Sequence, residues 1–260
     1  MEICYKIDFR EPDKIEIPSC KRIYFGHETC EKLLPEFNEI EQLLELSGKR
    51  NLELTFVTPF LTDKGIEKVM RFLEELKTVV RDFEIVVSDW GLLRLISSDK
   101  IGIPVVSRFL TGQQTDFRLK RFEKIPPVEM AEHLASCTLL KKQSLAFLDR
   151  YNIERFELSN TLQTVQTDGC EKYRYSLHVP FVPLSIFRTC PENFDFNHIR
   201  ENCNSRTCKR NRVEWSNPAS GYKIYCIDNA LYYANPDYET TLHSHTYIDR
   251  LVCDAAAPFL

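Results

Sequence analysis

Apolar strands alternate with helical segments through the first half of the chain, and few folds accommodate that pattern. Strand patterns cover residues 22–26, 52–58, 83–88 and 104–107, and they are rich in β-branched and aromatic residues. Residues 64–80, between the second and third of these, carry apolar side chains at helical spacing. Buried strands that alternate with helices are typical of a parallel sheet with helices outside it. We therefore predict an α/β fold with parallel strands.

The second half of the chain adds further strands but keeps the alternation less regularly. Residues 160–172 are polar and show no clear helical stripe. A turn at Asp228–Asn229 joins two convincing strand patterns. Because no low-complexity run or clean boundary divides the chain, we predict a single domain over residues 1–260, in which residues 221–260 form C-terminal strands. The other expected elements are strands at 154–159, 173–182, 221–227, 229–234 and 246–252, and helices from Pro35 onward and at 89–95, 128–135 and 141–151.

Composition narrows the class of protein and its expected partners. The apolar share of 43% and the charged share of 28% are ordinary for a globular protein. A net charge of −4 does not support a nucleic-acid partner, which usually requires a basic excess, and the basic run at 118–124 is typical of a solvated face. No stretch reaches the roughly 20 apolar residues of a membrane span, and residues 1–20 lack the apolar core of a signal peptide. We therefore expect a cytoplasmic protein whose ten cysteines are thiols, metal ligands or catalytic groups rather than disulfides.

Three cysteines gather in the polar segment 188–210, which we predict to be a cysteine-bearing loop. They are Cys190, Cys203 and Cys208. A free cysteine normally behaves as a small buried hydrophobe, and this segment has little apolar material to bury it against. Clustered thiols in a polar loop usually hold a metal or a cluster, or pair as a disulfide. We therefore predict a metal site here.

A fourth thiol is available at the end of the first predicted strand. Cys30 follows the strand at 22–26, and the loops at the carboxyl ends of strands are where α/β folds build their sites. Four thiolates suit either structural zinc or an iron–sulfur cluster, and the spacing of these cysteines leaves both open. His27 is an alternative ligand if the metal is zinc, and otherwise a histidine exposed in a loop.

Two carboxylates near strand ends are candidates for substrate contacts. Asp89 follows the strand at 83–88 and is equally suited to bind a substrate, to act as a base, or to cap the short helix that it precedes. Glu157 lies late in an apolar strand, where an isolated carboxylate would be costly to bury. We therefore expect Glu157 either to face a polar site or to pair with an arginine.

Four short motifs, in this order, resemble those of the collagenase-like peptidase family of unassigned mechanism, which includes the UbiU and UbiV proteins. They are IYFGHETC at Ile23–Cys30, VSDWG at Val87–Gly91, FELS at Phe156–Ser159, and the region from SLHVP at Ser176–Pro180 through Cys190 to Cys203 and Cys208. The segments 222–234 and 248–252 are similar to the family's C-terminal strands. The resemblance covers most of the chain from Arg22 on and is closest to the UbiV-like branch.

The resemblance implies a TIM-barrel-like (β/α) barrel with a small C-terminal β segment. It also implies a 4Fe-4S cluster on Cys30, Cys190, Cys203 and Cys208, the same four thiols. Its implied activity is oxygen-independent hydroxylation, with prephenate as the oxygen donor in several members and ubiquinone precursors or RNA bases as acceptors. Two departures stand out. Residues 160–172 lack the helix expected between barrel strands, which leaves an incomplete barrel open, and the Cys203–Cys208 spacing is one residue wider than the UbiV pattern.

The resemblance further implies an enzyme, or an accessory subunit of one, that works anaerobically in a pathway such as ubiquinone biosynthesis. We take Asp89, Glu157 and His178 as its candidate catalytic residues, prephenate as a candidate small-molecule substrate and a second family member as a candidate heterodimer partner. Two other hypotheses stay open. One is a zinc-stabilised, non-catalytic protein that binds a partner. The other is the peptidase of the family label, although the chain contains no Gly-x-Ser-x-Gly or His-Glu-x-x-His motif.

Overall fold

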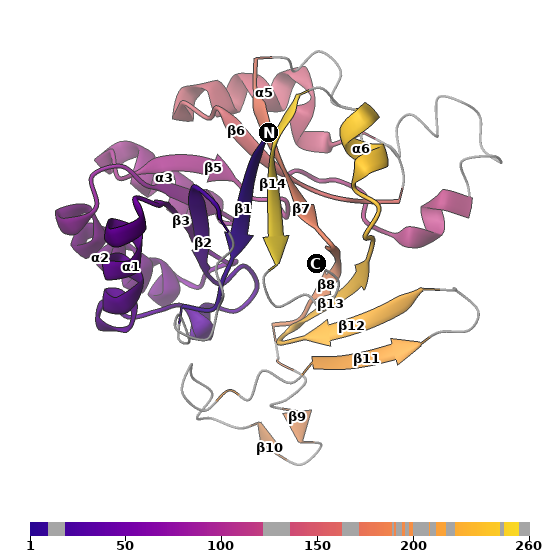
Figure 1. Cartoon of the computed structure of the whole chain (residues 1–260), viewed down its shortest axis with the longest axis horizontal. Helices are drawn as coiled ribbons and strands as arrows, with labels where there is room; N and C mark the ends of the chain where they lie inside the picture. Colours follow the sequence, from indigo (N-terminus) through magenta and orange to yellow (C-terminus); the bar gives the residue numbers. More distant parts are fainter. Residues whose placement is uncertain are drawn as a thin grey trace.

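Eight parallel strands close into a barrel (Figure 1). The structure is a computed structural model, and the residues it describes are 1–9, 19–121, 136–162, 172–188, 190, 194–195, 198–199, 208, 212–216, 222–244 and 247–254. The predicted α/β barrel is thus confirmed, and it is closed rather than incomplete. In chain order its strands are β1 (Glu2–Lys6), β2 (Arg22–Gly26), β3 (Glu53–Val57), β4 (Glu84–Val87), β5 (Ile103–Val106), β6 (Arg155–Ser159), β7 (Arg174–Val179) and β14 (Ile248–Asp254).

The strand that completes the barrel is β1, which the sequence patterns did not indicate. It pairs in parallel with β2 on one side and with β14 on the other, so the first and last strands of the chain lie side by side (Figure 1). Glu2 and Lys6 share one face of this strand, and Ile3 on the other face is 44% exposed. A strand with charged residues on one face and an exposed apolar residue on the other does not resemble a buried parallel strand. β1 therefore joins the barrel because it pairs with β2 and β14, and not because its own sequence is typical of a barrel strand.

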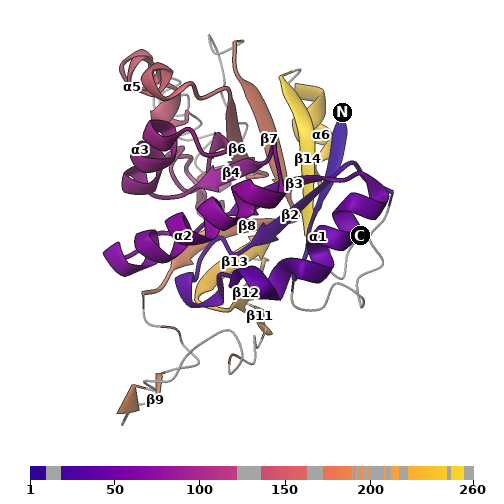
Figure 2. The same ribbon diagram turned by 90° about the vertical axis from the view of Figure 1, so that its left-hand side faces the viewer.

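Helices cover one side of the barrel, where α1, α2 and α3 lie together (Figures 1 and 2). Phe72 of α2 stacks on Phe56 of β3, with 4.6 Å between the ring centroids. The expected helix at 128–135 lies outside the described residues, as does most of the segment 160–172. Among the helices of the described ranges, none is long and apolar enough to cross a membrane. The helices are η2 (Glu31–Leu33), η3 (Phe37–Ile40), α1 (Glu41–Arg50), α2 (Asp63–Val79), α3 (Trp90–Asp99), η4 (Phe117–Arg121), η5 (Thr138–Leu140), α5 (Lys142–Leu148), η6 (Asp149–Tyr151) and α6 (Glu239–Ser244).

The interior of the barrel is filled with side chains in layers. At the amino ends of the strands, Arg250 Nη1 lies 2.6 Å and Arg22 Nη1 lies 3.2 Å from Glu84 Oε2. This ion-paired layer joins strands from opposite sides of the barrel, because the three residues come from β14, β2 and β4. The next layer is a small apolar cluster of buried residues, as is usual for barrels of this size. Its members are Cys4, Tyr24, Val57, Val86, Val105 and Val252.

A smaller antiparallel sheet lies beyond the carboxyl ends of the barrel strands (Figure 1). Its strands, in spatial order, are β11 (Arg212–Ser216), β12 (Lys223–Ile227), β13 (Ala230–Ala234) and β8 (Phe181–Ile186). The expected C-terminal strands therefore divide, since β12 and β13 join this sheet and β14 joins the barrel. The predicted strand at 173–182 also divides, into β7 and β8. Two further short strands, β9 (Phe194–Asp195) and β10 (His198–Ile199), pair only with each other among the described residues.

Candidate functional site

Charged side chains are buried at the carboxyl ends of the barrel strands, the end that the antiparallel sheet covers. Lys6 ends β1, while Glu28 and Arg108 stand in the loops after β2 and β5. Glu157 and His178 lie on β6 and β7. Arg108 also donates from Nη1 to the carbonyl oxygen of Phe181 at the start of β8, over 2.7 Å. These residues therefore form the floor beneath the sheet and one of its attachments to the barrel.

Glu28 is held by two cations. Arg108 donates from Nε to Oε2 over 3.1 Å and from Nη2 to Oε1 over 2.7 Å, and Lys6 Nζ lies 2.6 Å from Oε1. Burial by itself would raise the pKa of Glu28, but Arg108 and Lys6 hold that pKa well below its ordinary value. A bidentate guanidinium–carboxylate pair is among the strongest polar contacts in proteins. Glu28 is thus a fixed, ionised carboxylate at the centre of the barrel mouth.

Glu157 and His178, two of the three predicted catalytic residues, lie against each other. His178 Nε2 is 3.0 Å from Glu157 Oε2, although the angles at this contact are not those of a hydrogen bond. Both residues are buried, and the edge of the Tyr24 ring faces His178 with 6.1 Å between the ring centroids. Within the described part of the chain, Glu157 Oε1 has no hydrogen-bond partner. The pair is therefore a carboxyl group and an imidazole side by side inside the barrel, the types of group that most often act in acid–base catalysis.

Asp89, the third predicted catalytic residue, caps a helix. Its Oδ1 accepts hydrogen bonds from the amides of Gly91 over 2.8 Å and Leu92 over 3.1 Å, at the start of α3. This geometry is one of the alternatives that the sequence left open. Among its described hydrogen bonds, none reaches Glu157 or His178. The structure therefore brings together two of the three residues and gives the third a local role.

One cavity between the barrel mouth and the sheet is lined entirely by described residues, and it is small. Its volume is about 10 Å³, which is room for roughly one water molecule. Its wall combines charged and polar side chains with three apolar ones, Val179 and Val252 of the barrel and Phe181 of the sheet. It is lined by Lys6, Glu28, Arg108, His178, Val179, Phe181, Val252 and Asp254.

The loops that carry Cys30 and Cys190 meet at one turn of the sheet, at Asp228–Asn229 between β12 and β13. Asn229 donates from Nδ2 to the carbonyl oxygen of Thr29, the residue before Cys30, over 2.8 Å. Cys190 Sγ lies 3.8 Å from the carbonyl oxygen of Asp228, a weak thiol contact. Two of the four predicted cluster ligands therefore approach the same turn, from the barrel and from the end of β8.

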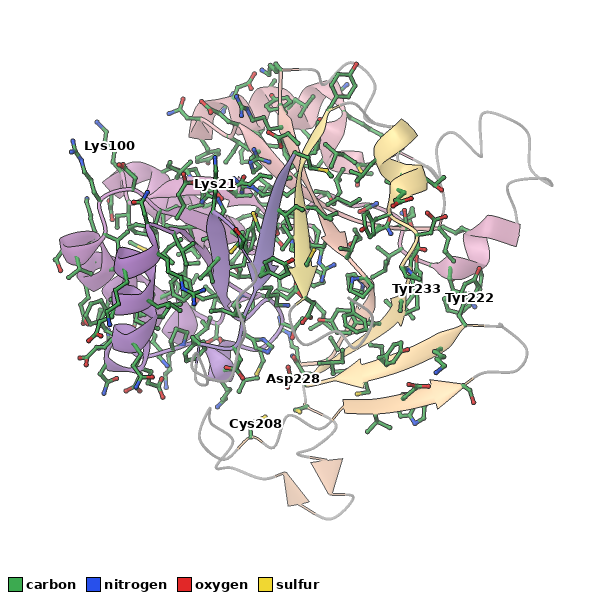
Figure 3. All side chains as sticks on the ribbon, in the orientation of Figure 1. Lys21, Lys100, Cys208, Tyr222, Asp228 and Tyr233 are labelled. Atoms are coloured by element: carbon green, nitrogen blue, oxygen red, sulfur yellow. The ribbon has the colours of Figure 1, made fainter. Side chains whose placement is uncertain are left out.

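The other two predicted ligands are Cys203 and Cys208. Cys203 lies outside the described residues, while Cys208 is half-buried and is seen below Asp228 in Figure 3. Across the described ranges, no three His, Cys, Asp or Glu side chains lie close enough together to hold a metal ion. Cys30, Cys190 and Cys208 are partly buried thiols, which suit a thiolate-bound metal in their chemistry, and the loops of the first two contact one turn. The four-thiol set, which includes Cys203, stays a prediction.

Several residues of this site were not indicated by the sequence patterns. Lys6 and Arg108 stand at or just beyond the ends of strands, where polar residues of α/β folds usually face a site, and that rule alone would have indicated Arg108. Asp228 was recognised only as part of a turn. Its side-chain contact with His27 joins residues 201 positions apart in the chain.

Comparison with models of known protein families and with curated proteins gave no match.

Proposed function

We propose that this chain is an iron–sulfur protein of the collagenase-like peptidase family, nearest to its UbiV-like branch, that takes part in oxygen-independent hydroxylation. One observation carries the proposal. The loops of Cys30 and Cys190 share the Asp228–Asn229 turn at the mouth of a closed parallel barrel, and the buried His178, with Glu157 against it, lines a cavity at the same end of the barrel. A thiolate site and an acid–base pair at one barrel mouth suit a redox enzyme better than either alone.

In this proposal Cys30, Cys190, Cys203 and Cys208 hold a 4Fe-4S cluster. When bound, such a cluster supplies one-electron redox chemistry, and its potential depends on burial and on hydrogen bonds around its ligands. The His27–Asp228 contact and the Cys190–Asp228 contact are of this kind, since both lie around the thiol loops. A second chain of the same family, as a heterodimer partner, belongs to the same proposal.

The chain's own residues have three tasks in the reaction. Glu157 and His178, whose Oε2 and Nε2 atoms lie 3.0 Å apart, are the groups that would accept a proton from the acceptor substrate or donate one to it. The sheet keeps water away from them, because the cavity beneath it holds about one water molecule. Lys6 and Arg108 are the cations that an anionic donor such as prephenate would contact, in competition with Glu28.

The small cavity favours a second candidate function. A mouth with room for about one water molecule also suits a zinc-stabilised, non-catalytic protein that binds a partner. Both candidates use the same thiols, so the metal itself distinguishes them.

The test is the metal content of the chain purified without oxygen. We expect about four irons and four sulfides per chain, together with the visible absorption of an iron–sulfur cluster. Cys203→Ala should abolish both, whereas Cys20→Ala, which changes a half-buried cysteine outside the predicted set, should leave both intact. A colourless protein with about one zinc per chain would overturn the cluster and support the zinc-stabilised alternative.

A further inference from the structure

The hydrogen bonds of His27 define which of its nitrogens carries the proton. The amides of Cys30 and Thr29 point their N–H groups at Nδ1, over 3.0 and 3.3 Å. Because an amide N–H only donates, Nδ1 must present a lone pair. The proton of the neutral ring therefore lies on Nε2, which is 2.9 Å from Asp228 Oδ2 and donates to it.

The partner carboxylate is also fixed in place. His27 is 7% exposed and Asp228 is 8% exposed, so little water competes for their contact. Asp228 has a φ of +54°, in the left-handed region that aspartate tolerates better than most residues. Figure 3 shows Asp228 at one end of the sheet, with Tyr222 and Tyr233 at the other. The contact is therefore made at the end of the sheet where the chain turns from β12 to β13.

Asn229, the residue after Asp228, links the turn between β12 and β13 to the loops that carry Cys30 and Cys190. Asn229 donates from Nδ2 to the carbonyl oxygens of Thr29 and Phe187, over 2.8 and 2.9 Å. Phe187 in turn donates its amide to the carbonyl oxygen of Asn229 over 2.7 Å. Phe187 directly follows β8, on the run of chain that leads to Cys190. The turn is thus hydrogen-bonded to the loop before Cys30 and to the loop before Cys190.

We propose that His27 is a positioning residue for the thiol site. Its Nδ1 orders the backbone at Cys30 and its Nε2–H fixes that loop to Asp228, so that Cys30 of the barrel is held at the same turn as Cys190. Both ring nitrogens are occupied by these contacts, which makes His27 a support for the ligand loop rather than a zinc ligand. The inference rests on the proposed thiolate site and names the residue that assembles it.

Two substitutions separate the two contacts of the ring. His27→Asn places an amide oxygen where Nδ1 stands, which keeps the contact with the Cys30 amide and removes the one with Asp228. His27→Gln reaches Asp228 with an amide nitrogen in place of Nε2 and removes the acceptor for Cys30. Asp228→Ser removes the His27–Asp228 contact by changing the carboxylate instead of the histidine. It therefore tests the same contact if a His27 variant fails to fold. His178→Asn is the matched control, the same change at a buried histidine on β7.

The measurement is a titration of the reduced, metal-free full chain with Co²⁺, followed by the thiolate-to-cobalt charge-transfer absorption. We expect His27→Asn and Asp228→Ser to weaken Co²⁺ binding by about 10- to 100-fold, as removal of a group that supports a metal ligand typically does. His27→Gln should fall between these variants and the native chain, and His178→Asn should bind Co²⁺ as the native chain does.

The outcomes separate this inference from the proposed function. Native-like Co²⁺ binding by both His27→Asn and Asp228→Ser, or an equal loss in His178→Asn, would overturn the positioning role. Absence of the thiolate-to-cobalt band from the native chain would overturn it as well. A native chain that binds Co²⁺ through its thiols, loses this in His27→Asn and yet carries no iron when purified would retain the inference and remove the iron–sulfur function.

Discussion

The environment of Glu157 is hard to explain by stability alone. Its side chain is 1% exposed, and one carboxylate oxygen has no hydrogen-bond partner among the described residues. A buried polar atom without a partner costs on the order of 1–3 kcal/mol. Proteins accept such costs chiefly where chemistry requires the group, and His178 beside it is a suitable proton partner.

We therefore expect Glu157→Gln to leave the free energy of unfolding within about 1 kcal/mol of the native value, or to raise it. The amide has the same shape, and a neutral group costs less to bury than an ionised one. Turnover of the cluster-loaded protein should fall by about 10²- to 10⁴-fold, the usual contribution of a general acid or base. Urea denaturation and a turnover assay measure the two effects. Glu84→Gln is the control: it removes the carboxylate that lies 2.6 Å from Arg250 Nη1, leaves Glu2 as the remaining partner of Arg250, and should destabilise by about 3–5 kcal/mol. Equal destabilisation by both variants would make Glu157 a structural residue.

Arg108→Met should lower the free energy of unfolding by an amount that depends on pH. The substitution leaves Glu28 buried with Lys6 as its remaining cation, which costs about 3–5 kcal/mol near neutral pH. In the native chain the pKa of Glu28 lies below its ordinary value of 4.5. The paired carboxylate therefore stabilises the fold above about pH 4.5, and this stabilisation is lost as the pH falls through the lowered pKa. In the variant Glu28 accepts a proton more readily, so the difference between the two proteins should shrink in acid.

Urea denaturation of both proteins from pH 7 down to pH 3 checks this sign. The double variant with Glu28→Gln serves as control, because it removes the buried charge together with its partner. A difference in unfolding free energy that stays constant over this range would contradict the role assigned to the pair.

Residues of the site were predictable from the sequence where the signal is local. Cys30 follows the end of a strand, as expected, and Glu157 lies within the apolar strand β6, where its charged neighbour is a histidine rather than an arginine. Arg108 and Glu28 are 80 residues apart, and His27 and Asp228 are 201 apart. Nothing in a single sequence indicates which distant residues become neighbours, because that depends on the order in which strands pair. The polar contacts that assemble the mouth were therefore beyond prediction.

At the scale of single elements, apolar periodicity gave the barrel strands β2 to β6 within a residue or two. It failed at β1, whose charged face points into an ion-paired layer, and at 173–182, where an apolar run continues from the barrel into the sheet. The two failures have different causes. At β1 the charged face conceals the burial from a search for apolar residues, whereas at 173–182 periodicity reports that residues are buried but not which of two neighbouring cores buries them.

The cap of α3 offers a test at this scale. Asp89→Ala removes the acceptor for the amides of Gly91 and Leu92 and should lower the free energy of unfolding by about 1 kcal/mol. Metal content and turnover should not change, because the described contacts of Asp89 are confined to its own helix. Thermal unfolding and metal analysis measure the two effects, and Asp89→Asn should recover most of the stability since asparagine is an equally good cap. A loss of turnover with stability unchanged would return Asp89 to the substrate site.

At the scale of the whole molecule, the sheet and the barrel are two layers joined by polar contacts. One junction is the His27–Asp228 contact beside the thiols, and another is a reciprocal pair of buried amides. Asn160 donates from Nδ2 to the carbonyl oxygen of Asn235, and Asn235 donates from Nδ2 to that of Asn160, both over 3.0 Å. Such polar contacts fix the position of the sheet on the barrel, but they bury little apolar surface between the two. The sheet should therefore open more easily than the barrel unfolds.

Asn235→Ala tests this by removing one junction. The change leaves the carbonyl oxygens of Asn160 and Thr161 without their donor, so we expect the sheet to loosen by about 1–3 kcal/mol. Amide hydrogen exchange should accelerate in β8, β12 and β13, while β3 and β4, in the centre of the helix-covered side, keep the native rates. Uniform acceleration in both layers would mean that they open as one unit. Because Glu157 and His178 lie beneath the sheet, selective loosening would also identify the motion that admits a substrate to them.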